Sequence, residues 1–337
     1  MILNFEHHCA SHCETGVVSN MLNFYGYQLS EPMIFGIGEG LTFIYIPFMP
    51  FKGNSLKFSY RSFPGSIFTC TMKKLHIKAG MKRFSNKEEA MKAMDNLIAK
   101  GTPVGNVVGL YHLPYSPVRA HFNAHNLCVV GKEGDQYIIS DPCWHATLLN
   151  ISYNDLMKVR FSEGAFKPRG KMYWIKEISV LPDLSQIILR SIQNTCTKMI
   201  GFPLGTTLGV RGINYLSKKI RGLETRYGEK DRMYYLASLV QAIEEIGTGG
   251  AGYRYMYGTF LHEAANTLNK PELKDFSVEI TRIGDLWRQF ALECLRKVKN
   301  RSNASYNELA DMVQNIATAE KDFFIALKKY VKTECKK

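Results

Sequence analysis

The hydrophobic pattern of the chain changes near residue 180, and no other feature of the sequence constrains the fold as strongly. After Pro182-Asp183, apolar residues recur every three or four positions in long segments, a spacing that predicts α-helices. The predicted helices cover residues 184–200, 212–223, 231–246, 253–268, 273–298 and 305–333, with breaks at 201–203 and 247–252. We therefore predict an all-α helical domain over residues 181–337, with the domain boundary between 178 and 183.

The first 180 residues combine helical and strand-like patterns, which predicts an α+β domain. Three glycines at positions 36, 38 and 40 lead into an apolar, strand-like run over residues 41–48. A helix is expected at 85–100 and a strand at 102–113. Two further strands at 121–131 and 136–141 flank a polar turn at 132–135, so they should form a β-hairpin.

Cys13 lies near the start of the chain, in the first turn of a predicted helix. The sequence Ser11-His12-Cys13-Glu14-Thr15 opens an apolar helical pattern that Gly26 ends. Ser11 and Glu14 have the spacing of a capping box, so Ser11 is the predicted N-cap. In the first helical turn, free backbone N–H groups and the positive end of the helix dipole favour a thiolate at Cys13. The alternative is that Cys13 is a small, inert core residue.

A nucleophilic cysteine needs a base, and the base needs a group that orients it. The predicted hairpin would bring His125 and Asp141 close together across its two strands. His121 is a rival base, because in an extended segment it shares a strand face with His125. Asp141 precedes Pro142 and has an alternative role as a turn residue. Cys13, His125 and Asp141 are the predicted catalytic residues, in the chain order of papain-like enzymes.

The sequence leaves the oxyanion hole incomplete. The backbone N–H of Cys13 is one expected donor, and His7 or His8 is a candidate for the second. The cluster from His7 to Cys13 also has a spacing that would put two metal ligands on one helix face. Because no Cys-x-x-Cys pair or second ligand cluster completes it, we expect no metal site.

Composition limits the partners and the location that we expect. The 337 residues carry a net charge of +13, so an acidic partner is expected unless the charge serves only solubility. Neither a nucleic-acid-binding motif nor an apolar run of membrane-spanning length occurs, so nucleic acid and membrane are not expected partners. The N-terminus lacks the pattern of a secretory signal, so we expect a cytoplasmic protein with reduced thiols.

Short motifs recur in a defined order along nearly the whole chain. The N-terminal half contains His12-Cys13-Glu14-Thr15, Ser30-Glu31, residues 35–40, Leu113-Pro114-Tyr115, His125 with Val129-Val130-Gly131, and Ser140-Asp141-Pro142. The helical half adds Tyr253-Arg254, Tyr257 and residues 260–265. This series resembles the butirosin-type acyltransferase family.

The resemblance implies a papain-like cysteine protease fold in residues 1–180 that is used for synthesis. Family members take an acyl group from the phosphopantetheine thioester of a carrier protein, hold it on a cysteine and pass it to an amine. By this resemblance Cys13 is the nucleophile, His125 the base and Asp141 the orienting carboxylate. The implied partners are an acidic acyl or peptidyl carrier protein and a small amine or diamine. No cofactor is implied beyond the phosphopantetheine arm of the donor.

In this picture the helical domain over residues 181–337 binds substrate and acts as a lid that keeps water from the acyl-enzyme. The expected substrate-binding residues are His12, Tyr253, Tyr257 and Glu263. A cysteine peptidase or amidohydrolase would use the same three catalytic residues and is an alternative function. A non-catalytic binding protein, in which Cys13 is only buried, is another.

Overall fold

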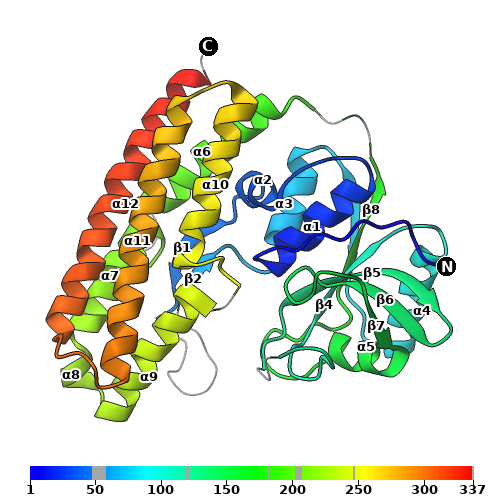
Figure 1. The fold of residues 1–337 in the computed structure, drawn as a ribbon, viewed down its shortest axis with the longest axis horizontal. Helices are drawn as coiled ribbons and strands as arrows, with labels where there is room; N and C mark the ends of the chain where they lie inside the picture. The colour runs from blue at the N-terminus through cyan, green and yellow to red at the C-terminus, as the bar shows by residue number, and fades with distance from the viewer. Residues whose placement is uncertain are drawn as a thin grey trace. The chain divides into compact units, whose positions relative to one another are not determined.

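The computed structural model describes residues 1–47, 58–117, 121–178, 180, 182–201, 207–245 and 247–335. The chain folds into two compact units. The sheet unit consists of residues 1–34 and 67–182, and the helical unit consists of residues 35–66 and 183–337 (Figure 1).

The sheet unit is built on a six-stranded sheet with the strand order β3-β8-β4-β5-β6-β7, in which neighbouring strands are antiparallel. The strands are β3 (Lys78–Lys82), β4 (Val104–Val108), β5 (His125–Glu133), β6 (Gln136–Ser140), β7 (Leu149–Ser152) and β8 (Met172–Glu177). The accompanying helices are α1 (Cys13–Phe24), α3 (Ser66–Lys74), α4 (Lys87–Ile98) and α5 (Tyr153–Arg160).

Helices cover both faces of this sheet. On one face, Leu127 and Val129 of β5 join a core cluster with apolar side chains of α4 and α5. Side chains alternate along a strand, so Asn126 and Cys128 point to the opposite face, and α1 packs against β5 there. The N-terminus of α1 and the first residues of β5 are therefore brought together.

Strands β5 and β6 form the predicted hairpin, and its turn is Gly134-Asp135, one residue later than the centre predicted from the sequence. A β-bulge between Val129 and Gly131 then shifts the register by one residue. This one-residue shift in register cancels the one-residue displacement of the turn. Continuing the register beyond the bulge places Asp141 diagonally across from His125, on the same face of the ladder.

Two predicted strands are shorter than their hydrophobic patterns suggest. The strand expected over residues 102–113 ends at Val108, because the backbone N–H of Gly109 donates to Val159 of α5 at 2.9 Å and leaves the sheet. The strand expected from residue 121 begins only at His125. Just before it, the Asn123 side chain donates to loop carbonyls at Glu163 and Ala165.

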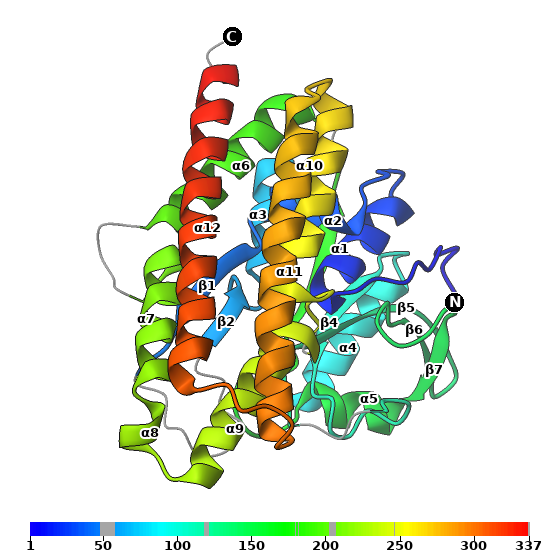
Figure 2. The same ribbon diagram turned by 60° about the vertical axis from the view of Figure 1, so that its left-hand side comes forward.

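All six helices predicted after residue 180 are present in the helical unit, with ends that differ by a few residues. They are α6 (Leu184–Ile200), α7 (Gly209–Arg221), α9 (Glu229–Val240), α10 (Arg254–Leu268), α11 (Glu272–Val298) and α12 (Tyr306–Glu334), with a short α8 (Leu223–Arg226). The third continues as a π-helix over Gln241–Glu245, and residues 202, 203 and 246 of the predicted segments lie outside the described part of the chain. In Figure 2, α11 runs alongside α10 and α12, consistent with the contacts between these helices. None of the described helices combines the length and apolar character that crossing a membrane requires.

Residues 35–66 belong to the helical unit, which the predicted division at residue 180 did not anticipate. Helix α2 (Glu31–Ile37) leads into β1 (Leu41–Tyr45), which pairs with β2 (Phe58–Arg61) as a two-stranded antiparallel ribbon. Phe43 of this ribbon stacks on Trp287 of α11, with ring centroids 6.2 Å apart. The described elements after residue 183 are all helices, as predicted, and residues 35–66 add one β-ribbon to this unit. Residue 48 of the predicted strand lies outside the described residues.

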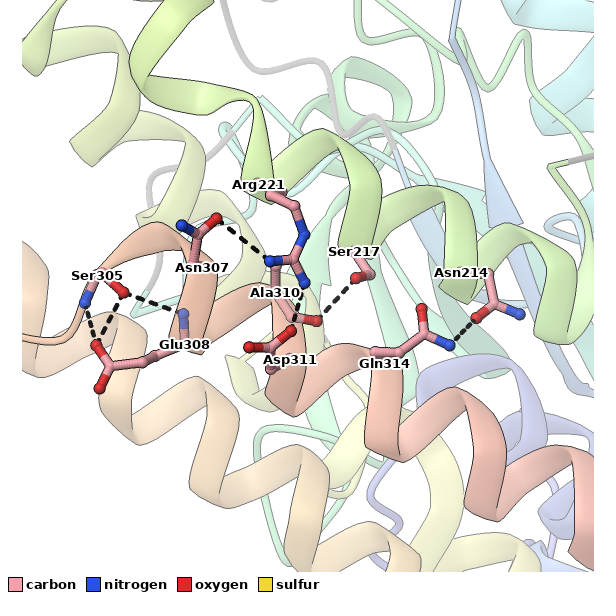
Figure 3. A network of polar contacts seen from close by, with 9 residues as sticks. All are labelled: Asn214, Ser217, Arg221, Ser305, Asn307, Glu308, Ala310, Asp311 and Gln314. Atoms are coloured by element: carbon pink, nitrogen blue, oxygen red, sulfur yellow. Dashed lines mark hydrogen bonds and ion pairs between the residues drawn. The ribbon is translucent and has the colours of Figure 1, made fainter.

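Polar contacts fix α12 against α7 (Figure 3). Ser217 donates to the carbonyl of Ala310 at 2.8 Å, and Gln314 donates to Asn214 at 2.7 Å. Arg221 bridges to both Asn307 and Asp311. The start of α12 is closed by the capping box Ser305-x-x-Glu308, which satisfies backbone donors that a helix end leaves free.

Candidate active site

The first turn of α1 carries Cys13, as predicted, but its cap differs from the prediction. The N-cap is His12, whose Nδ1 accepts from the Thr15 N–H at 3.4 Å, so the predicted capping box of Ser11 and Glu14 is wrong. The carboxylate that holds this backbone comes instead from Glu31 of α2. Its two oxygens accept from the N–H of Ser11 at 2.9 Å and of His12 at 2.7 Å.

Glu14 does cap a helix, but the helix is α3. The side chain is fully buried, and its Oε1 accepts from the backbone N–H groups of Ile67 at 3.1 Å and Phe68 at 3.2 Å. These are donors in the first turn of α3, which have no carbonyl one turn earlier to bind. Glu14 therefore ties the start of α1 to the start of α3.

His125 and Asp141 lie side by side, as the hairpin argument predicted. His125 Nε2 lies 2.7 Å from Asp141 Oδ2, and both side chains are buried. Asp141 also accepts from the Tyr115 hydroxyl at 2.9 Å and from the Cys143 N–H at 3.2 Å. Burial opposes a charge on His125, but the charge and hydrogen bond of Asp141, followed by the contact with Cys13, raise the pKa of His125 to about 10.

Cys13 lies in an environment that favours the thiolate. A hydrogen bond with Cys143 holds the pKa of Cys13 well below its usual range, and the hydrogen bond and charge of His125 act in the same direction against burial. The pKa of Cys143 is raised, first by that hydrogen bond and then by burial, so Cys143 keeps its proton and donates it. Because Nε2 of His125 binds Asp141, its Nδ1 is the nitrogen left for Cys13. A thiolate–imidazolium pair at a helix N-terminus is the reactive form of a cysteine nucleophile.

The rival base does not take part in this arrangement. His121 is exposed and precedes β5. Its ring stacks on Tyr111, with centroids 4.0 Å apart. Of the two candidates, the structure brings only His125 to Asp141.

The two histidines suggested as the second oxyanion donor differ in their contacts. Both ring nitrogens of His7 are engaged, Nδ1 with Ser140 Oγ at 2.7 Å and Nε2 with the His145 carbonyl at 2.8 Å. His8 forms an ion pair of 3.4 Å with Glu6. His7 is therefore not available as the donor in this structure, because Ser140 and the His145 carbonyl bind its ring, and the suggestion of His8 stays a prediction.

Sequence reasoning missed three side chains of the site. Asn126 donates from Nδ2 to Cys13 Sγ over 3.7 Å, Cys143 forms a hydrogen bond with Cys13, and the Tyr115 hydroxyl donates to Asp141. Asn126 and Cys143 each lie within two residues of a predicted catalytic residue. This closeness in sequence was the signal that could have identified Asn126 and Cys143, because loops next to a catalytic residue commonly carry further site residues.

The residues expected to bind substrate do not share one role. His12 is buried as the cap of α1, with its Nδ1 3.0 Å from Thr15 Oγ1. Tyr253 stacks on Phe35 with centroids 5.1 Å apart, and Tyr257 is fully buried in the core of the helical unit. Packing or capping contacts bury each of these three side chains, and their assignment to substrate binding stays a prediction. Glu263 of α10 is half-buried, and its assignment stays a prediction.

Two other features of the sheet unit bear on ligand binding. Among the described residues, no group of three or more His, Cys, Asp or Glu side chains is arranged to hold a metal ion. A groove is lined in part by residues of α1, and Cys13 is not among its lining residues. They are His8, Cys9, Ala10, Gly16, Ser19, Asn20, Asn23, Gln28, Leu29, Ser30 and Glu31.

Comparisons with known proteins place the chain in a family. Residues 12–142 match the family described as "Butirosin biosynthesis protein H, N-terminal". Residues 154–327, more than half of the chain, match the family described as "Domain of unknown function (DUF4872)". The chain therefore belongs to the family of that second domain, and its N-terminal part matches the butirosin family, in agreement with the resemblance seen in its motifs.

The chain has low sequence identity to a solved peptidase structure. A crystal structure described as a C39-like peptidase from Bacillus anthracis is 14% identical, with a TM-score of 0.36, and the match covers 53% of this chain and 98% of that one. No curated protein sequence matches the chain. The match to the butirosin family and the grouping of Cys13, His125 and Asp141 indicate a cysteine-dependent enzyme.

Proposed function

We propose that the protein is an amide-forming acyltransferase, which moves an acyl group from a carrier-protein thioester through Cys13 to an amine. The observation that carries the proposal is the thiolate of Cys13 at the start of α1, paired with His125 and Asp141. The match to butirosin biosynthesis protein H supports a role in natural-product, antibiotic-type biosynthesis. The site would need no cofactor other than the phosphopantetheine arm that the donor brings.

The proposed reaction has two balanced halves. The Cys13 thiolate adds to the thioester carbonyl, the donor C–S bond breaks, and the departing thiol takes the proton from His125. His125 then accepts a proton from the incoming amine, whose nitrogen adds to the acyl group on Cys13. The Cys13–acyl bond breaks, so the thiolate–imidazolium pair is restored. The role of Asp141 is to hold the ring and stabilise its positive charge.

The charge of the chain supports an acidic donor protein. Its net charge is +13, and most of the excess of Lys and Arg lies in the helical unit. A basic surface raises the rate of encounter with an acidic carrier protein. Since a reactive thiolate must stay reduced, we also propose that the protein works in the cytoplasm.

The experiment is to incubate the protein with an acyl-carrier-protein thioester and follow its intact mass. A mass gain equal to the acyl group, lost in Cys13→Ala and His125→Ala but kept in His121→Ala, is the expected result. Addition of a small amine or diamine should then remove the adduct and yield the amide. Failure of every carrier thioester tried to acylate Cys13 contradicts the proposal.

A cysteine peptidase or amidohydrolase is the second candidate, because the same three side chains can direct water to an acyl-enzyme. It is distinguished in the same assay. A peptidase should cleave peptide substrates in a Cys13-dependent way and release free acid, with no gain in rate from an amine.

A further inference from the structure

The oxyanion hole of this site lacks an identified second donor. Addition of Cys13 to a carbonyl creates a negative charge on oxygen, and preorganised N–H donors stabilise that charge. The Cys13 N–H lies at the start of α1 and has no carbonyl one turn earlier in the helix to bind. His7 and His8 are engaged with other groups.

We propose that the side-chain amide of Asn126 is the second oxyanion donor for Cys13. This inference deepens the proposed function and rests on it in one respect, that Cys13 attacks a carbonyl carbon. Asn126 lies next to His125 on β5, points to the face that α1 covers and is buried. Its Nδ2 lies 3.7 Å from Cys13 Sγ.

The orientation of the amide follows from its neighbours. Nδ2 lies 3.1 Å from the carbonyl oxygen of Ala124, which can only accept a hydrogen bond, so the nitrogen must be on that side. Oδ1 accepts from the hydroxyl of Tyr173 on β8 at 3.0 Å. One N–H of the amide is thereby used, and the other is directed at Cys13.

That second N–H is available when the reaction needs it. A distance of 3.7 Å to sulfur makes a weak hydrogen bond, so little is lost when the N–H turns to a better acceptor. In the tetrahedral adduct, the oxyanion is bonded to the carbon that Sγ attacks, beside the sulfur that the N–H already faces. A buried amide held by two partners needs little reorganisation at that moment.

Strand β4 leaves space for the Tyr173 ring that supports Asn126. Gly105 of β4 pairs with Tyr173, and a Cβ on Gly105 would lie 2.2 Å from the Tyr173 ring. The absence of a Cβ at Gly105 therefore lets the Tyr173 ring lie close to the β4 backbone, with its hydroxyl bound to Asn126. We assign Tyr173 and Gly105 as positioning residues, because they act on the reaction only through Asn126.

The test compares two reactions of Cys13 in the full-length protein. Acylation by p-nitrophenyl acetate passes through an oxyanion, whereas alkylation by iodoacetamide is a displacement at saturated carbon and forms none. Peptide mass mapping assigns both modifications to Cys13. Neither reagent requires a carrier protein or an amine, so the result stands whether or not the chain transfers acyl groups between such substrates.

We expect Asn126→Ala to lower the acylation rate by about 10²- to 10³-fold and to leave alkylation nearly unchanged. Tyr173→Phe and Gly105→Ala should lower acylation by a smaller factor, again without loss of alkylation. Asn106→Ala is the matched control, since Asn106 is a buried asparagine of β4 that also donates to the carbonyl two residues before it. It should change neither rate.

Two outcomes overturn the proposal. If alkylation falls as much as acylation in Asn126→Ala, the amide supports the thiolate or the fold and is not an oxyanion donor. If acylation does not fall, or if wild-type Cys13 is alkylated readily but acylated no faster than free cysteine, the site provides no stabilisation of the oxyanion through Asn126.

Discussion

The Nε2 atom of His125 lies 2.7 Å from Oδ2 of Asp141, and the contact is shielded from water because both side chains are buried. A charge pair in such surroundings is stable only when further hydrogen bonds satisfy it. Asp141 has two of them, from the Tyr115 hydroxyl and the Cys143 N–H. The carboxylate can therefore keep a proton on His125 while the thiol of Cys13 loses its own.

Replacing Asp141 by Asn should remove the imidazolium. Burial lowers the pKa of His125, and the Asp141 charge raises it. Without that charge, we expect the effect of burial to dominate, so the ring should be neutral at pH 7. The pKa of Cys13 should then rise, because the nearby positive charge is lost. We expect alkylation of Cys13 by iodoacetamide at pH 7 to slow by about tenfold for each unit of that rise. An unchanged rate would show that Asp141 does not control the thiolate.

The pH profile of alkylation tests the same pair in the wild type. The lowered pKa of Cys13 keeps the thiolate as pH falls below the usual range of a thiol, and the raised pKa of His125 keeps the imidazolium up to about pH 10. The rate at Cys13 should therefore be flat through neutral pH. The contribution of the raised His125 pKa to the free energy of unfolding should be fully present below pH 6.5, the ordinary pKa of histidine. It should be lost as pH rises through about 10. The opposite sign applies to Cys13, whose contribution is lost as pH falls through its lowered pKa. A tenfold rise in the alkylation rate per pH unit between pH 6 and 8 contradicts this pairing.

Cys143 should act as a hydrogen-bond donor to the thiolate. Cys143→Ala removes the contact that contributes most to the low pKa of Cys13, so the midpoint of the alkylation profile should move to higher pH. Cys143→Ser keeps a donor and should restore part of the shift. Cys196→Ala, at a buried thiol of the helical unit, is the control and should leave the midpoint unchanged. Equal midpoints in wild type and Cys143→Ala would refute the donor role.

Gly16 should be needed for the loop of Asp141–Cys143 to reach α1. A Cβ at Gly16 would lie 2.4 Å from the Cβ of Ala10 and 2.9 Å from the ring of Pro142. Gly16→Ala must displace that loop, so we expect slower alkylation of Cys13 and a higher midpoint. Gly228→Ala serves as the control, because nothing lies within 4 Å of the added methyl group. Wild-type reactivity in Gly16→Ala would show that the loop need not approach so closely.

Glu14 should stabilise the start of α3. Glu14→Ala leaves the N–H groups of Ile67 and Phe68 without their acceptor, which costs about 1–3 kcal/mol for a buried donor. Hydrogen exchange of the peptide over residues 66–74 should become faster, whereas Glu133→Ala at the exposed hairpin end should not change it. Unchanged exchange in Glu14→Ala would mean that other groups cap α3.

Local spacing predicted much of this molecule, because helix and hairpin patterns are properties of neighbouring residues. The long helices after residue 180 and the approach of His125 to Asp141 followed from such patterns. The acceptor at the start of α1 did not, since Glu31 arrives from another element and replaces the expected Glu14. Likewise, the burial of Tyr257 and the placement of residues 35–66 in the helical unit depend on tertiary packing, which no local spacing encodes.

The most direct measurement is a single-turnover chase of the acyl-enzyme. The protein is loaded from an acyl-carrier-protein thioester, the adduct is mapped by peptide mass spectrometry, and a small amine is then added. The account predicts that the acyl group resides on Cys13, persists in water, and leaves as the amide when the amine arrives. An acyl group on another residue, or its release as free acid at a rate that the amine does not change, would contradict it.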